Sequence, residues 1–303
     1  MRRCPHTMLA RIEAYLSRRR ALGYQLRSEG NYLLNFARYA DEAGHRGPPR
    51  TSLMLRWARL TRRAHRPSWA RRLQIVRCFA KDCQGWEPRT QVPPRHFFGP
   101  VATRPTPYLY SQKQMRMLLA RARRLPGPRQ PQTYATLLGL LACTGLRISE
   151  ALGLRVADVD LTGGVLRINQ SKYHKVRWVP LHARTVARLR AYLRQRQRWF
   201  PQAQHLFLAQ NASPLTRTRV EKTFRGLRCG LADSGTPRLH DLRHTFAANV
   251  LLRWQAQKQG VAHRLGVLAC YLGHNRVADT YWYLQAFPAL LAQAGRGFRL
   301  AGK

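Results

Sequence analysis

The sequence predicts a mainly α-helical protein with a small antiparallel β-sheet, and three observations lead to this fold class. Apolar residues recur at intervals of three and four over most of the chain, as on the buried faces of helices. One short stretch after Gly163 alternates with a period of two, as in a strand. Six prolines between residues 87 and 110 separate two helical regions, and 303 residues suffice for two domains.

The first region, residues 1–86, is predicted to form four helices. Thr7 caps the first, and Ser28 starts the second after a stop at Gly23. Beyond a Gly-Pro-Pro turn, Thr51 begins the third helix and Pro67 the fourth. The predicted exposed faces are rich in arginine. We interpret this region as a DNA-binding domain, while a merely solvated basic surface is the plainer alternative.

Residues 87–110 are predicted to be an extended, proline-rich linker, followed by a second domain over residues 111–303. In the second domain we expect helices over 111–119, 132–143, 183–199 and 216–229, a hairpin of strands 165–169 and 176–179, and a short strand over 205–209. The helix over 216–229 is strongly basic, so it either straddles a DNA groove or presents a solvated face.

The charge of the chain is extreme. Lys and Arg number 54 against 13 Asp and Glu, which gives a formal net charge of +41. Such a chain is expected to bind a polyanion, and because the cations are spread along it, we expect double-stranded DNA contacted by both domains. Arginine fills 47 of the 54 cationic positions. Part of that excess reflects genome base composition, so the raw count overstates the number of phosphate contacts.

The cysteines give no sign of a metal site or a disulfide framework, because the six lie at 4, 78, 83, 143, 229 and 270 without a CxxC pair. No metal and no other cofactor are therefore expected. The start of the chain lacks the pattern of a signal peptide, and the longest apolar run, residues 134–146, is too short to span a bilayer. We expect a cytoplasmic, nucleoid-associated protein without a membrane partner.

Two short stretches offer cationic groups suited to phosphate. Arg147 follows Gly145 and opens a new helical turn, where free backbone amides already favour anions. Glu150 lies three residues on and would either orient that guanidinium or form a weak surface ion pair. In the predicted hairpin turn, Lys172 and Lys175 both suit a general acid, because lysine gives up a proton more readily than arginine. Spacing alone does not separate the two lysines.

Residues 239–283 bring several reactive groups into one segment. His240 and Arg243 are three apart and share a helix face, and His274 and Tyr283 follow. An arginine, two imidazoles and a phenol suit the attack of a tyrosine on a phosphodiester, with the guanidinium as a phosphate clamp and the imidazoles as proton carriers. Taken singly, each of these residues is more often a packed core residue.

Together these motifs resemble the tyrosine recombinase, or phage integrase, family. The resemblance covers roughly residues 105–287 and is carried by the stretches 144–150, 171–172, 179–181, 240–245, 272–274 and 280–283. It implies a helical N-terminal core-binding domain and an α+β catalytic domain. Six catalytic residues match in order: Arg147, Lys172, His240, Arg243, His274 and Tyr283. The family spacing after the last histidine selects Tyr283 over Tyr281, and the hairpin comparison favours Lys172 over Lys175.

The resemblance implies site-specific recombination through a 3′-phosphotyrosine, by four identical or related protomers on two DNA sites. The residues around Tyr283 look most similar to recombinases of transposable elements. The segment 287–300 would pack on a neighbouring subunit or on its own domain. Two rival functions are DNA relaxation like that of type IB topoisomerases and a non-catalytic DNA-binding accessory role. The complete set of six residues favours recombination.

Overall fold

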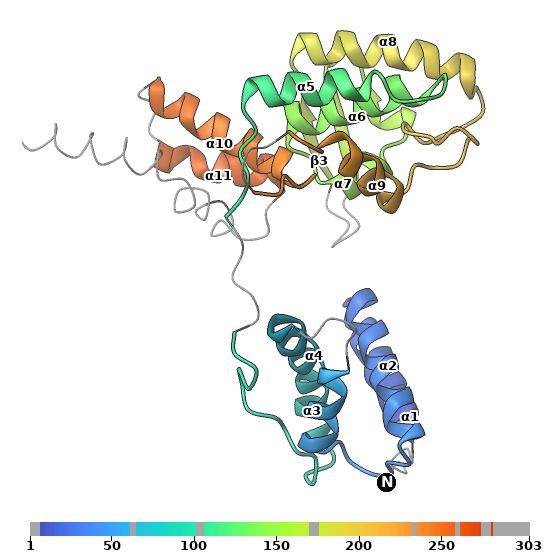
Figure 1. Ribbon diagram of the computed structural model, residues 1–303, viewed down its shortest axis with the longest axis vertical. Coiled ribbons are helices and arrows are strands. Elements are labelled where there is room, and N and C mark those ends of the chain that lie inside the picture. Colours follow the sequence, from blue (N-terminus) through green and yellow to red (C-terminus); the bar gives the residue numbers. More distant parts are fainter. Residues whose placement is uncertain are drawn as a thin grey trace, which may run out of the picture. The chain divides into compact units, whose positions relative to one another are not determined.

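The computed structural model describes residues 7–60, 65–100, 106–169, 176–231, 235–257, 261–273 and 280. It divides into two compact units, Met1–Pro105 and Thr106–Lys303. The division falls within the stretch predicted to be a linker. Figure 1 shows the described helices and strands of each unit, with all the α-helices and strand β3 labelled. The described helices include none that is long and apolar enough to cross a membrane.

The described part of the first unit consists of helices packed around one apolar core. They are α1 (Met8–Ala21), α2 (Arg27–Glu42), α3 (Thr51–Arg59) and α4 (Arg66–Gln84). The predicted cap at Thr7 is confirmed, because its side chain accepts a hydrogen bond from the Ala10 amide, and α3 begins at Thr51 as expected. The rings of Phe36 and Trp57 meet edge to face at 5.3 Å in the fully buried core. Apolar spacing therefore predicted these helices to within two residues at their starts.

Part of the predicted linker belongs to the first unit. Val92 and Phe98 pack against its core, and the Gln91 side chain accepts a hydrogen bond from the Thr51 amide at the start of α3. Tyr110 instead joins the core of the second unit. The prolines exclude helix and sheet pairing here, but they leave the intervening aromatic side chains available for packing. The predicted linker is thus irregular in backbone structure, but its side chains pack on the cores of the units that it joins.

The second unit combines helices with one small sheet. Its described helices are α5 (Gln112–Ala122), α6 (Gln130–Thr144), α7 (Ile148–Gly153), α8 (Ala183–Trp199), α9 (Arg217–Leu227), α10 (Asp241–Ala256) and α11 (Val261–Leu272), with a 3₁₀ turn at Val156–Asp158. The strands β1 (Val159–Asp160), β2 (Val165–Asn169) and β3 (Val176–Pro180) pair antiparallel in that order. The mainly α fold with a small antiparallel sheet is therefore confirmed, although the two-residue β1 was too short to predict.

The predicted strand over residues 205–209 is wrong. His205 and Leu208 make only isolated bridges, to Arg155 and Pro214. The stretch between them is apolar because its side chains are buried in succession, not because they alternate across a sheet. A short apolar run indicates that its side chains are buried, but it does not specify a strand. The backbone of residues 205–209 forms hydrogen bonds with loops on both sides.

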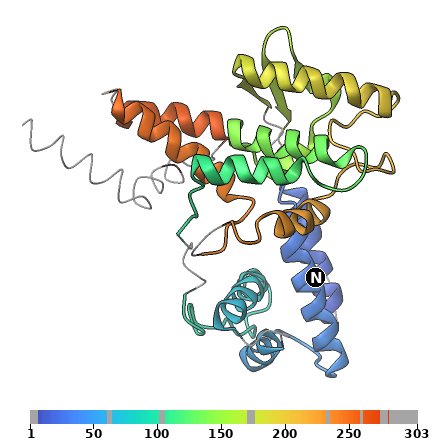
Figure 2. The same cartoon turned by 45° about the horizontal axis from the view of Figure 1, so that its top comes forward.

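Helix α6 is the centre of the second unit. Its residues Leu137, Leu138, Leu140 and Leu141 are all buried, because α5, α8 and α10 pack around it. Figure 2 shows α5 and α6 lying side by side. The helix ends at Gly145, whose φ of 63° lies in the left-handed region that glycine tolerates best. A side chain at Gly145 would also come within 2.5 Å of the Phe246 ring.

We expect Gly145→Ala to lower the free energy of unfolding by about 1–3 kcal/mol, because alanine resists the positive φ and its methyl group meets Phe246. Gly139→Ala is the matched control, because Gly139 lies within α6 with nothing near its missing side chain. That change should stabilise by about 0.5–1 kcal/mol. Denaturant unfolding of both variants measures the difference, and equal effects would contradict this role of Gly145.

Candidate active site

Arg147 occupies the position before the first turn of α7, where the chain leaves the left-handed turn at Gly145. Its backbone amide donates to one oxygen of Glu150 at 2.9 Å, and its guanidinium donates to the other at 2.8 Å. The Arg147 side chain is 36% exposed, whereas that of Glu150 is only 8% exposed. The pair is therefore not the solvated surface contact considered as the plainer alternative, and Glu150 orients the guanidinium as expected.

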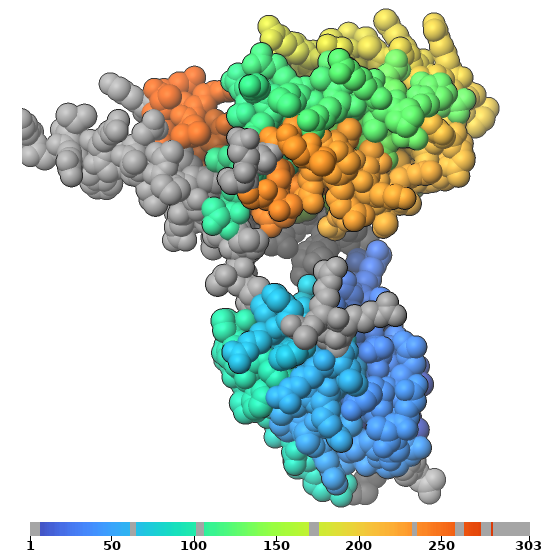
Figure 3. Space-filling model, viewed as in Figure 1, coloured from blue at the N-terminus to red at the C-terminus, as the bar shows by residue number. Residues whose placement is uncertain are grey.

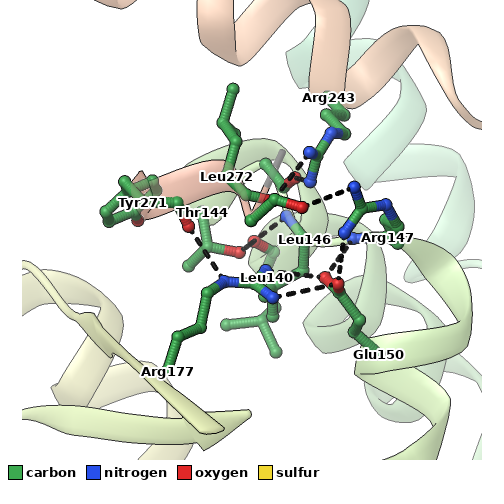
Figure 4. Close-up of polar contacts among 11 residues, drawn as sticks. Leu140, Thr144, Leu146, Arg147, Glu150, Arg177, Arg243, Tyr271 and Leu272 are labelled. Carbon is green, nitrogen blue, oxygen red and sulfur yellow. Dashed lines mark hydrogen bonds and ion pairs between the residues drawn. The ribbon is translucent and has the colours of Figure 1, made fainter. Parts of the chain in front are cut away.

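Arg243 lies in the first turns of α10 and is almost completely buried. One terminal nitrogen donates to the Gly145 carbonyl at 2.8 Å, and the other donates to the Leu272 carbonyl at 2.7 Å. Arg147 donates to the next carbonyl, that of Gly273, at 2.8 Å. Figure 4 shows the two guanidiniums side by side against the end of α11. The structure thus brings together two arginines that are 96 positions apart in the sequence.

A third arginine, Arg177 on β3, completes this cluster. It was not predicted from the sequence as a residue of the site. Both of its terminal nitrogens donate to Glu150, at 3.0 and 2.8 Å, and its Nε donates to the Tyr271 carbonyl at 3.0 Å. A signal was present: in β3 the exposed positions hold Val176 and Trp178, while the arginine between them points inward. This reversal of the usual alternation marks a buried polar contact.

The electrostatics of Glu150 follow from its two arginines. Burial by itself would raise the pKa of this carboxyl, but hydrogen bonds from Arg177 and Arg147 outweigh that effect and hold the pKa below its ordinary value. Glu150 is therefore ionised at neutral pH, and its charge binds both guanidiniums.

His240 immediately precedes α10, and its ring meets that of His244 edge to face at 4.6 Å. Desolvation by the surrounding protein, followed by repulsion from Arg243, lowers the pKa of His240 to about 4. The residue as a whole is nevertheless exposed, at the edge of the groove described below. His244 is more deeply buried, and desolvation lowers its pKa to about 3. Both rings are neutral at pH 7, and His240 is therefore able to accept a proton.

An open, positively charged groove adjoins these residues, with a volume of about 840 Å³. Its cationic lining comes from the start of α7, from α9 and from the segment before α10: Arg147, Arg217, Arg225, Arg228 and Arg238. The neutral ring of His240 also lines the groove. Glu221 is the acidic residue in this lining. Figure 3 shows the face formed by α9 and the segment leading into α10, in orange, next to α5 in green. The basic helix predicted over 216–229 lies at this groove.

Asp241 fixes the rim of the groove. Its fully buried carboxylate accepts from the Arg238 amide at 2.7 Å and from the Arg238 guanidinium at 2.8 and 3.1 Å. Because this aspartate directly follows His240, the contact ties the segment carrying the imidazole to a cation at the groove.

The structure brings Arg147, His240 and Arg243 together, since the first two line one groove and the two arginines bind adjacent carbonyls. Lys172, Lys175, His274, Tyr281 and Tyr283 lie outside the described residues, as does the segment 287–300. The described strands β2 and β3 flank the two lysines in sequence, and α11 ends at Leu272, shortly before His274. Among the described residues, no group of three His, Cys, Asp or Glu side chains is suited to hold a metal ion.

Comparison with known proteins gives a consistent result. Residues 109–289 match the model of the phage integrase family. A protein of Sinorhizobium fredii named as an integrase/recombinase, y4rB, is 42% identical over 299 residues, which cover 94% of this chain and 95% of that protein. The tyrosine recombinase XerC of a Methylobacterium species is 37% identical over 172 residues, covering 54% of this chain and 51% of that protein.

The fold is also similar to solved recombinase structures. The Tn1549 transposon integrase in complex with transposon right-end DNA superimposes with a TM-score of 0.65 at 17% identity, covering 91% of this chain and 94% of that one. The XerA recombinase superimposes with a TM-score of 0.52 at 22% identity, covering 96% of this chain and 98% of that one.

We expect the protein to lose stability as the pH falls from about 6.5 toward 4. The unfolded chain takes up a proton on His240 near its ordinary pKa of 6.5, whereas the folded protein does so only near 4. The contribution of neutral His240 is thus complete above pH 6.5 and is lost as the pH falls through this interval. Denaturant unfolding at pH 7, 6 and 5 should show a shallower loss for His240→Asn than for the wild type.

Carboxylates that protonate in the same interval are common to both proteins, so the difference between the two pH profiles isolates His240. Parallel profiles would mean that its imidazole titrates alike in the folded and unfolded chains.

Proposed function

The chain belongs to the phage integrase family of tyrosine recombinases, and we propose that it cleaves and rejoins DNA at specific sites through a covalent 3′-phosphotyrosine. The observation that carries this proposal is the pair of guanidiniums on Arg147 and Arg243. They bind adjacent backbone carbonyls beside a cationic groove, directly before the segment that holds His274 and Tyr283. Two fixed guanidiniums are suited to hold one phosphodiester group.

In the proposed reaction, the phenol oxygen of Tyr283 attacks the scissile phosphate. A bond forms between that oxygen and phosphorus, and the bond from phosphorus to the 5′-oxygen breaks. His240, whose ring is neutral at pH 7 and so has a free nitrogen lone pair, accepts the phenol proton. Lys172 gives a proton to the departing 5′-oxygen, with Lys175 as the less favoured alternative. His274 donates a hydrogen bond to the phosphate.

Arg147 and Arg243 are proposed to hold the non-bridging oxygens, whose negative charge grows in the transition state. Their carbonyl contacts hold the two guanidiniums side by side before DNA arrives, and Arg243, which is almost completely buried, exchanges a carbonyl contact for a phosphate oxygen when DNA binds. The energy of the broken phosphodiester is kept in the tyrosine adduct. Attack by a free 5′-hydroxyl reverses the step and rejoins a strand, and neither a metal nor another cofactor is required by this chemistry.

Double-stranded DNA is the proposed partner, and the groove lined by α9 is its proposed contact in the second unit. Exchange between two DNA sites calls for four active centres, so we propose a tetramer of this chain or of this chain with related recombinases. The similarity of the fold to that of a transposon integrase supports a role in a mobile genetic element. We accordingly place the protein with the nucleoid in the cytoplasm, without a membrane partner.

We expect wild-type protein, mixed with sheared genomic DNA of its host, to form adducts that survive SDS. Sequencing the bound DNA ends would give the crossover sequence, and a nicked duplex carrying it would trap the adduct. Tyr283→Phe should abolish the adduct because phenylalanine has no nucleophilic oxygen, whereas Tyr281→Phe is the control that should retain it.

An adduct that persists in Tyr283→Phe would overturn the assignment of the nucleophile. A protein that binds DNA but never forms an adduct would instead fit the accessory role, and relaxation of a plasmid without exchange between two sites would fit a topoisomerase.

We expect Arg225→Ala to weaken DNA binding and to lower the salt dependence of the binding constant by about one unit of log–log slope, because one phosphate contact is lost. Arg194→Ala is the matched control, because it removes the same charge from the exposed surface of α8, outside the groove lining. Fluorescence anisotropy titrations at several salt concentrations measure both slopes. Equal effects at the two positions would mean that the groove does not bind the duplex.

A further inference from the structure

The end of α11 is held by three arginines from three other elements. The consecutive carbonyls of Tyr271, Leu272 and Gly273 accept hydrogen bonds from Arg177, Arg243 and Arg147, at 3.0, 2.7 and 2.8 Å respectively. The last carbonyls of a helix have no partner within the helix and carry a partial negative charge, so guanidinium donors suit them well. Figure 4 shows this arrangement from the side of β3 and α7.

Two of these arginines have a proposed role at the phosphate, and Arg177 does not. Its side chain is only 11% exposed, and it spans Glu150 and the Tyr271 carbonyl with all three of its nitrogens. Each nitrogen of the Arg177 guanidinium group is therefore held by a group of the protein itself. One of those groups is the carboxylate that binds Arg147.

The charge of Glu150 is divided between two guanidiniums because Arg177 is present. Each carboxylate oxygen accepts from Arg177, and the same two oxygens accept from the Arg147 amide and guanidinium. Arg147, Glu150 and Arg177 together carry one net positive charge. Without Arg177 the buried carboxylate would turn fully toward Arg147, neutralise it and draw its donors away from a phosphate.

We infer that Arg177 is a positioning residue for DNA cleavage, acting through Glu150 to aim Arg147 and to keep it available to the scissile phosphate. Through the Tyr271 carbonyl it also fixes the end of α11, three residues before His274. The inference rests on the proposed function, because it assigns Arg177 a role in that same site. It adds to the six residues expected from the sequence a residue that never contacts the substrate.

The test is a double-mutant cycle on the nicked duplex whose crossover sequence is mapped from wild-type adducts. The single-turnover rate of adduct formation at saturating DNA is measured for wild type, Arg177→Gln, Arg147→Lys and the double variant. Arg177→Gln should slow cleavage by about tenfold to a hundredfold while the Kd for DNA changes by less than about threefold. In the Arg147→Lys background the same change should cost less than about threefold, because the group it positions is already altered.

Arg167→Gln is the matched control. Arg167 lies on the neighbouring strand β2, opposite Trp178, and pairs with its own carboxylate on Asp158. The Arg167→Gln protein should cleave the nicked duplex at the wild-type rate. If Arg177→Gln lacks a cooperative thermal unfolding transition, Arg177→Lys replaces it in the cycle, since it keeps the charge but cannot hold both oxygens of Glu150 and the carbonyl.

Wild-type rates in a folded Arg177 variant would overturn the inference. So would an equal loss of rate in both backgrounds, because a merely structural residue would lower the rate whatever stands at position 147. An absence of adducts from the wild-type protein would overturn the proposed function and this inference together. This outcome is distinguished from the others because it is observed with the wild-type protein alone, before any variant is tested.

Discussion

The ion pair that Glu150 makes with Arg147 and Arg177 is the interaction on which the candidate site depends. The carboxylate joins α7 to β3, and its two arginines reach on to the end of α11. A buried carboxylate is costly unless its oxygens are fully bonded, and here four N–H donors surround them. Removing either arginine would leave part of that charge without a partner. The three side chains therefore depend on one another, and their contacts fix the relative positions of α7, β3 and the end of α11.

The network lies on a rigid base. Helix α6 buries a run of leucines beneath α5, α8 and α10, so its end cannot shift without disturbing the core. The turn at Gly145 then delivers two groups to the site in succession: its own carbonyl, which accepts from Arg243, and the side chain of Arg147 two residues later. Close packing of Gly145 against Phe246 and Leu272 connects the turn to both α10 and α11.

The sequence predicted the helices well because their apolar spacing is local information. The helix expected over 183–199 is found at Ala183–Trp199. The helix expected over 111–119 begins at a capping box, in which the Ser111 hydroxyl accepts from the Gln114 amide and the Ser111 amide donates to the Gln114 side chain. The strand expected over 205–209 failed because an apolar run reports burial and does not specify the backbone partner. Nor could spacing predict that Arg147 would bind Gly273, 126 residues away. Arg177 stands out only because β3 exposes its apolar neighbours and turns the arginine inward. That pattern can be interpreted only once the partner of Arg177, the Glu150 carboxylate, is known.

Several of the few acidic residues have a specific structural role. With 13 acids against 54 cations, the buried ones serve to orient particular arginines: Asp241 holds Arg238, and Glu150 holds Arg147 and Arg177. In the first unit, Asp41 instead binds the amides of Met8 and Leu9 at the start of α1. Neutralising the excess of cations would need far more acids than the chain contains. Because the buried acids act as fixed anchors within the fold, the groove keeps the positive charge that binding to a DNA phosphate backbone requires.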